Sequence, residues 1–128
     1  AMVKENIDSG VFRAIQIAAL SALDYPESEI NKLRDIYAKR KKLLADTLIN
    51  LGYDVKKTDA TFYLWVKTPK NISSAKFANL LLEKANVVVT PGLGFGPSGE
   101  GFIRFSLTID EDRIKEGIER IKRFTPPF

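Results

Sequence analysis

Apolar residues three and four positions apart predict helices in four parts of the chain. The first helix follows Asp8 or Ser9, either of which can cap it, and it ends before Pro26. Its apolar face consists of Phe12, Ile15, Ala19 and Leu23. The second helix runs over residues 28–51, and Gly52 ends it. At 1.5 Å per residue it is roughly 35 Å long, more than a small core requires. We therefore expect its N-terminal part to reach toward something outside that core.

Two shorter helices are predicted further along the chain. Ser73 or Ser74 begins the third helix, which turns Phe77, Leu80 and Leu81 inward. Thr108 and Glu111 have the spacing of a capping box for the last helix. The inner face of that helix consists of Ile114, Ile118 and Ile121, and Pro126-Pro127 ends it.

Short strands are predicted between these helices. Residues 53–57 form an edge strand, residues 60–66 a strand rich in aromatic and β-branched side chains, and residues 87–90 a buried strand. A last strand follows a glycine-rich loop. This order predicts an α+β domain of two layers, in which a small mixed sheet of about three to four strands is covered by helices on one face. We expect residues 1–128 to be a single domain, with residues 1–2 set aside as a candidate cloning remnant.

One cation interrupts the last strand. Side chains alternate between the two faces of a strand, so Arg104 lies opposite the core residues Ile103 and Phe105. A guanidinium among apolar neighbours is costly without an anionic partner, and its planar fork matches a carboxylate. We interpret Arg104 as a carboxylate receptor beside a flexible loop. The alternative is a surface ion pair with Glu100, and a plain hairpin-like loop is the alternative for the glycine-rich segment.

Three other motifs indicate structure more than chemistry. The glycines of residues 92–96 do not open into a helix, as a dinucleotide fingerprint must, and they lack the end of a P-loop. The Ser-Ser-Ala-Lys run at residues 73–76 is similar to serine–lysine and pyridoxal-lysine sites, but it precedes an ordinary amphipathic helix. We interpret Ser73 as its cap and Lys76 as a solvated lysine. The acidic residues 110–112 suit the positive end of a helix dipole better than a metal.

Composition narrows the chemistry. The chain has no cysteine and no histidine, which excludes thiolate chemistry and the commonest general base at neutral pH. No apolar run approaches the roughly 20 residues of a membrane helix, and no signal peptide is visible, so a cytoplasmic protein is expected. The net charge is +4, and the densest basic run, residues 39–42, is interpreted as a solvated helix face.

Four segments together resemble one family: Asn-Ile-Asp-Ser-Gly-Val-Phe at 6–12, Ala-Thr-Phe-Tyr-Leu-Trp at 60–65, Thr-Pro-Gly-Leu-Gly-Phe-Gly at 90–96, and Gly-Glu-Gly-Phe-Ile-Arg-Phe-Ser-Leu at 99–107. Their order and spacing are similar to the C-terminal small domain of class I/II aminotransferases. These are fold-type I, pyridoxal-phosphate-dependent enzymes of the aspartate aminotransferase group. The first segment most resembles the LL-diaminopimelate aminotransferase branch, and the resemblance covers nearly the whole chain.

The resemblance implies roles for particular residues. In the family, the arginine at the position of Arg104 binds the α-carboxylate of the amino-acid substrate, which exchanges its amino group with a 2-oxo acid. Asn6 matches a position that can lie near substrate across the interface of a homodimer. Phe62 and Tyr63 match the family's aromatic strand, and we interpret them first as core residues and second as pocket lining.

The resemblance also implies what this chain lacks. The family's Schiff-base lysine, its aspartate for the pyridine nitrogen and its phosphate-binding residues lie N-terminal to the matched segments. We therefore assign no catalytic, cofactor-binding or metal residue here, and expect pyridoxal 5′-phosphate only in the full-length parent. The chain alone is expected not to transaminate. Its partner is expected to be the N-terminal large domain, which it closes over substrate, so helix one and part of helix two should expose apolar surface.

Two other classes of function stay open on the sequence. The chain could be a stand-alone, non-enzymatic module that binds a carboxylate through Arg104 or associates through its first helix. It could also be a basic nucleic-acid-binding domain that uses residues 39–42, although no aromatic residues interleave with that run as a stacking platform requires.

Overall fold

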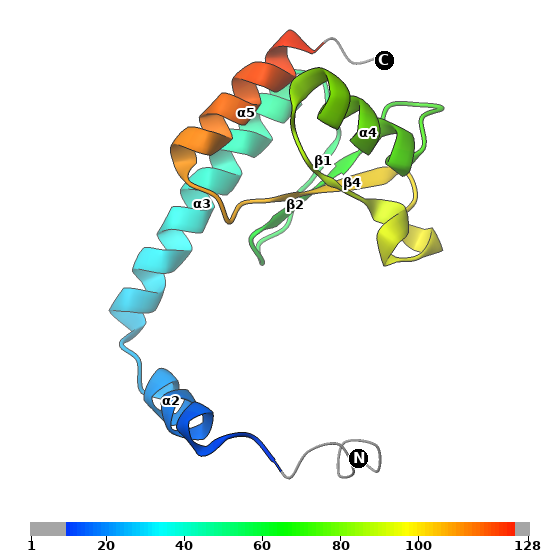
Figure 1. Ribbon diagram of the computed structural model, residues 1–128. Coiled ribbons are helices and arrows are strands. Elements are labelled where there is room, and N and C mark those ends of the chain that lie inside the picture. Colours follow the sequence, from blue (N-terminus) through cyan, green and yellow to red (C-terminus); the bar gives the residue numbers. More distant parts are fainter. Residues whose placement is uncertain (1–9, 125–128) are drawn as a thin grey trace. The chain divides into compact units, whose positions relative to one another are not determined.

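The computed structural model describes residues 10–124, which divide into two compact units at Asp35 and Ile36 (Figure 1). The first unit contains helix α2 (Arg13–Leu23) and the beginning of helix α3 (Glu27–Asn50). The second unit contains the rest of α3, then β1 (Val55–Lys56), β2 (Tyr63–Lys67), α4 (Ser74–Ala85), β3 (Thr90–Pro91), the short 3₁₀ helices η1 (Gly92–Phe95) and η2 (Pro97–Gly99), β4 (Phe102–Ser106) and α5 (Glu111–Arg123).

The four strands form one open sheet in the order β1-β2-β4-β3. The α+β class and the number of strands are confirmed, but each strand pair among the described residues is antiparallel, so the expected mixed sheet is wrong in that detail. The reason is topological. Helix α4 returns the chain so that β3 runs parallel to β2, yet β4 inserts between them and pairs antiparallel with both. The third strand is also shorter than the expected residues 87–90.

The core lies on one face of this sheet, between the strands and three helices (Figure 1). Alternation along β2 and β4 turns one set of side chains inward and leaves the other set on the opposite face. The buried strand residues are Leu64, Val66, Ile103 and Phe105. They pack with Leu44 and Leu48 of α3, Phe77 and Leu81 of α4, and Ile114, Ile118 and Ile121 of α5. The prediction of helices on one face is confirmed, and the opposite face is left for other contacts.

One of the two helix caps expected in this unit forms. The hydroxyl oxygen of Ser73 accepts a hydrogen bond from the backbone N–H of Lys76 at 3.3 Å, which confirms Ser73 as the cap of α4. The capping box of Thr108 is wrong. Helix α5 begins at Glu111 with Asp110 as its N-cap, so Thr108 lies one position too early and its hydroxyl lies 3.0 Å from that of Ser106.

Helix α2 has no buried residue. Phe12, at its N-cap, is 73% exposed and Leu23, at its end, is 82% exposed. On α3, Leu33 and Ile36 are also exposed, whereas Leu44 and Leu48 further along are buried. The expected exposure of apolar surface on these two helices is therefore present. The predicted caps Asp8 and Ser9 lie outside the described residues.

A membrane-spanning role finds no candidate among the helices of residues 10–124. None of them combines the length and the apolar character that crossing a bilayer requires.

Candidate functional site

Arg104 lies at the centre of the uncovered sheet face, between two aromatic rings. Its guanidinium carbon Cζ is 3.9 Å from the ring centroid of Tyr63 on β2 and 4.3 Å from that of Phe95 on η1. The strand register sets its other neighbours, since Arg104 pairs with Trp65 on β2 and Thr90 on β3. Rings that cover the faces of a guanidinium leave its edge of N–H donors open. The arrangement therefore holds a cation with its fork ready for an anion.

The donors of Arg104 have no anionic partner within the part of the chain that the structure describes. No Asp or Glu oxygen of residues 10–124 lies within 4.0 Å of its guanidinium nitrogens, and none of these residues accepts a hydrogen bond from them. The alternative ion pair with Glu100 is therefore wrong. Both oxygens of that carboxylate accept hydrogen bonds from Ser74 instead, one from the backbone N–H at 2.7 Å and one from the hydroxyl at 2.8 Å.

Glu100 thus occupies the N-terminus of α4. The bonds from the Ser74 backbone N–H and from its hydroxyl hold the pKa of the Glu100 carboxyl below its usual value, because they favour the ionised form. Ser74 is fully buried, and its hydroxyl oxygen also accepts a hydrogen bond from the backbone N–H of Leu93 at 3.3 Å. The glycine-rich segment is therefore tied to the start of a helix, and it forms two 3₁₀ turns where we expected a plain or flexible loop.

Two glycines close this segment by direct backbone contact. A Cβ atom placed on Gly92 would lie 1.9 Å from the carbonyl oxygen of Gly99 and 2.7 Å from that of Phe102. A Cβ on Gly99 would lie 2.1 Å from the carbonyl oxygen of Gly92. Only glycine allows the two ends of the segment to approach so closely. Their contact keeps η1, and with it Phe95, beside β4.

We expect Gly92→Ala to destabilise the second unit by about 2 kcal/mol, because the backbone must shift to relieve the overlap. Gly94→Ala is the matched control, since a Cβ there meets nothing within 4 Å. Urea unfolding followed by circular dichroism measures both variants. Equal midpoints for the two would show that the close approach of Gly92 and Gly99 is not required.

A hollow of about 510 Å³ lies on the same sheet face, beside the aromatic residues that surround Arg104. Trp65 and Phe95 meet edge to face at 5.4 Å, and Trp65 and Phe102 do so at 6.3 Å. The remaining lining residues are Lys56, Thr58, Thr61, Ser98 and Gly99. An apolar wall with a few polar groups suits the side chain of a small organic ligand.

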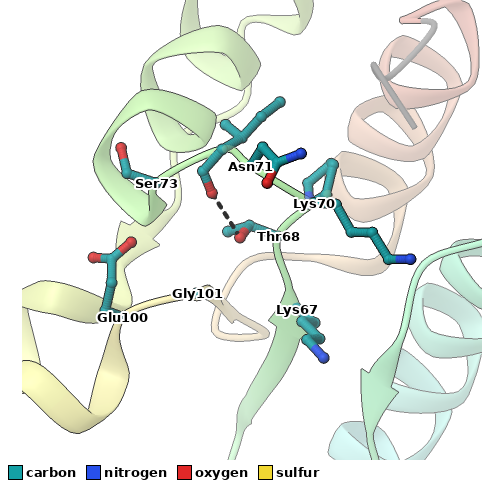
Figure 2. A pocket seen from close by; sticks show the side chains of 9 residues that line it. Lys67, Thr68, Lys70, Asn71, Ser73, Glu100 and Gly101 are labelled. Atoms are coloured by element: carbon teal, nitrogen blue, oxygen red, sulfur yellow. Dashed lines mark hydrogen bonds between the residues drawn. The ribbon is translucent and has the colours of Figure 1, made fainter.

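A second hollow, of about 350 Å³, lies at the turn between β2 and α4 (Figure 2). The hydroxyl of Thr68 donates to the carbonyl oxygen of Ile72 at 2.9 Å, and Asn71 has a φ of 63°, so the turn satisfies its own polar groups. Figure 2 shows Lys70 extending away from Glu100. We interpret this hollow as part of the turn, and Arg104 as the centre of the candidate site.

The basic run of residues 39–42 has partly structural contacts. The guanidinium of Arg40 donates to the carbonyl oxygen of Leu107 at 3.0 Å, and the ammonium group of Lys41 donates to that of Ala60 at 2.8 Å. Only Lys39 and Lys42 match the predicted solvated face. The run therefore fastens α3 to the loops around the sheet, and it offers a nucleic acid two free cations at most.

The acidic run of residues 110–112 also has partners. Glu111 and Asp112, in the first turn of α5, lie 2.9 and 3.3 Å from the ammonium group of Lys115. Asp110 lies 3.7 Å from the guanidinium of Arg40. These contacts agree with the structural interpretation of the acidic run.

Comparison with known proteins decides the family. A family model described as aminotransferase class I and II matches residues 3–121. The chain belongs to this aminotransferase family. An LL-diaminopimelate aminotransferase of Aquifex aeolicus is 48% identical over 120 residues, which are 94% of this chain and 31% of that protein. One of Halothermothrix orenii is 47% identical, with the same coverage.

Solved structures agree with this assignment. L,L-Diaminopimelate aminotransferase from Chlamydomonas reinhardtii matches with a TM-score of 0.84 at 32% identity, over 95% of this chain and 30% of that one. The aminotransferase resemblance seen in the sequence is therefore confirmed, including its diaminopimelate branch. The chain spans about a third of the length of these relatives.

Within this aminotransferase chain, the predicted site residues have different outcomes. Tyr63 is on the face away from the core and contacts Arg104, and Phe62 is exposed, so the core interpretation is wrong and pocket lining is favoured. Lys76 is exposed on α4, as expected of a solvated lysine. Asn6 lies outside the described residues, and its role stays a prediction.

Sequence reasoning missed two contacts that shape the site. Phe95 lies in a segment without periodicity, and no spacing rule could predict its position over Arg104. Ser74 was considered only as the start of a helix. A serine at a helix start followed by a glutamate between two glycines could have suggested the bond between Ser74 and Glu100.

Proposed function

We propose that this chain supplies the substrate-carboxylate receptor of an aminotransferase, which transfers an amino group between an amino acid and a 2-oxo acid. The observation that carries the proposal is Arg104, a guanidinium held between Tyr63 and Phe95 with its donors open among the described residues. A bidentate pair with the α-carboxylate orients the substrate as well as binding it. Aromatic neighbours lower the local polarity and strengthen that pair.

The substrate that fits the relatives best is LL-diaminopimelate. Support comes from the relatives that carry this name, at 48% and 47% identity. Diaminopimelate is a dicarboxylate with two amino-acid ends, so one end would engage Arg104. The hollow lined by Trp65 and Phe102 is available to the remainder of the molecule.

The cofactor of the whole enzyme is proposed to be pyridoxal 5′-phosphate, which supplies an electron sink for reactions of amino acids. Its site needs a lysine for an imine and a carboxylate facing the ring nitrogen. The described residues do not fit that need: Lys76 is exposed on α4, and Lys56 pairs with Asp54 at 3.4 Å. We propose that other parts of the enzyme hold the cofactor.

The partners proposed for this chain are the remaining two thirds of the enzyme and a second copy of it. The apolar side chains of α2 supply the surface for such a contact, since none of them is buried. Closure of this part of the enzyme over bound substrate would exclude water from the reaction. A cytoplasmic location stays a prediction.

The test is a transamination assay on the whole protein, with LL-diaminopimelate as amino donor and a panel of 2-oxo acids as acceptors. We expect turnover with LL-diaminopimelate to exceed that with aromatic amino acids. Turnover of aromatic donors alone would overturn the substrate, and the absence of any amino transfer would overturn the reaction.

A further inference from the structure

The glycine-rich segment carries one of the two rings that cover Arg104, so whatever holds this segment also shapes the receptor. Phe95 belongs to η1, and its ring centroid is 4.3 Å from the Cζ of Arg104. Phe95 itself is about half exposed, so burial alone does not hold its ring in place. The segment must be fixed from elsewhere.

Ser74 and Glu100 provide that attachment, and we call them the Ser74–Glu100 clamp. Glu100 directly follows η2, and its two carboxylate oxygens lie 2.7 and 2.8 Å from the backbone nitrogen and the hydroxyl of Ser74. The same hydroxyl accepts a hydrogen bond from the Leu93 N–H, two residues before Phe95. One fully buried side chain, Ser74, therefore joins both ends of the segment to α4.

The clamp uses strong interactions. Hydrogen bonds to a carboxylate are about twice as strong as those between neutral groups, and a negative charge at a helix N-terminus is favourable. Helix α4 is itself anchored, because Phe77 and Leu81 are fully buried in the core. The clamp thus transmits the rigidity of the core to a segment on the other side of the sheet.

We propose that Glu100 is a positioning residue of the substrate site, which holds Phe95 against Arg104 by binding the start of α4. The inference rests on the proposed function for its effect on substrate, but its effect on Phe95 is independent of that function. Loss of the clamp lets the ring move away, and the guanidinium then samples orientations that do not match a carboxylate.

Trp65 reports the position of Phe95, because the two rings meet at 5.4 Å and Trp65 is the only tryptophan of the chain. Acrylamide quenching of its fluorescence in the folded 128-residue chain measures how well the ring is covered. Glu100→Gln removes the charge with little change of shape. Glu83→Gln is the matched control, an exposed acid on α4 with no side-chain partner within residues 10–124. Phe95→Ala gives the value for complete removal of the cover.

We expect Glu100→Gln to raise the quenching constant about twofold, toward that of Phe95→Ala, because local opening exposes the indole ring. Glu83→Gln should match the parent chain. Ser74→Ala is the second variant, which removes the shared hydroxyl but leaves the backbone N–H, and it should give an intermediate value. Quenching constants equal to the parent for both clamp variants, even with lowered melting temperatures, would overturn the proposal.

A kinetic measurement on the whole enzyme tests the effect on substrate. Glu100→Gln should raise KM for the amino acid about fivefold with little change in kcat, the size expected for one lost cation–π contact. Its effect should be absent when Phe95→Ala is already present. An equal effect in both backgrounds would overturn the positioning role. If Arg104→Ala leaves KM unchanged while quenching changes as expected, the proposed function fails and the clamp stands.

Discussion

Replacement of Arg104 by alanine is expected to lower kcat/KM for the amino-acid substrate about a hundredfold in the whole enzyme. A bidentate bond between a guanidinium and a carboxylate at a partly covered site contributes about 3 kcal/mol. Most of the loss should be in KM, because the carboxylate is bound in the ground state as well as in the transition state. Steady-state kinetics with varied amino donor measures it.

Two variants sharpen this result. Arg104→Lys keeps the charge but loses the planar fork and the stacking on Tyr63 and Phe95, so kcat/KM should fall about tenfold. Arg123→Ala removes an exposed cation at the end of α5 and should leave the kinetics unchanged. If Arg104→Ala and Arg123→Ala behaved alike, Arg104 would not be the carboxylate receptor.

Phe77→Ala is expected to lower the free energy of unfolding of the second unit by about 4 kcal/mol. The Phe77 ring is fully buried where α4 meets the core, with Tyr53 at 6.1 Å and Phe124 at 6.5 Å between ring centroids. Such a loss is a large share of the 5–15 kcal/mol typical of whole domains. Urea unfolding at constant temperature measures it.

The control for this substitution lies on the same helix. Leu82 is 48% exposed, and Leu82→Ala should cost less than about 1 kcal/mol because little apolar surface is lost. Similar losses for Phe77→Ala and Leu82→Ala would contradict the position of the core under α4.

Local pattern was enough to predict most of the elements. Alternation placed Arg104 opposite Ile103 and Phe105, and the helical spacing of Ile114, Ile118 and Ile121 identified the inner face of α5. These features depend on which face of an element is buried, and a core in a two-layer domain imposes that choice on each element separately.

Features that depend on tertiary contacts were not predictable in the same way. The insertion of β4 between β2 and β3 follows from no local property of the strands. The partner of Glu100 is Ser74, 26 residues earlier, although Arg104 is much closer along the sequence. Phe95 reaches Arg104 only because Gly92 and Gly99 bring the ends of the segment together.

Strands β2 and β4 divide stability and recognition between alternate residues. Leu64, Val66, Ile103 and Phe105 serve the core, while their neighbours on the other face surround Arg104. Substitutions far from shared packing contacts act nearly independently. The binding face can therefore change its side chains with little loss of stability, and a new substrate preference can evolve on this sheet while the fold beneath it stays intact.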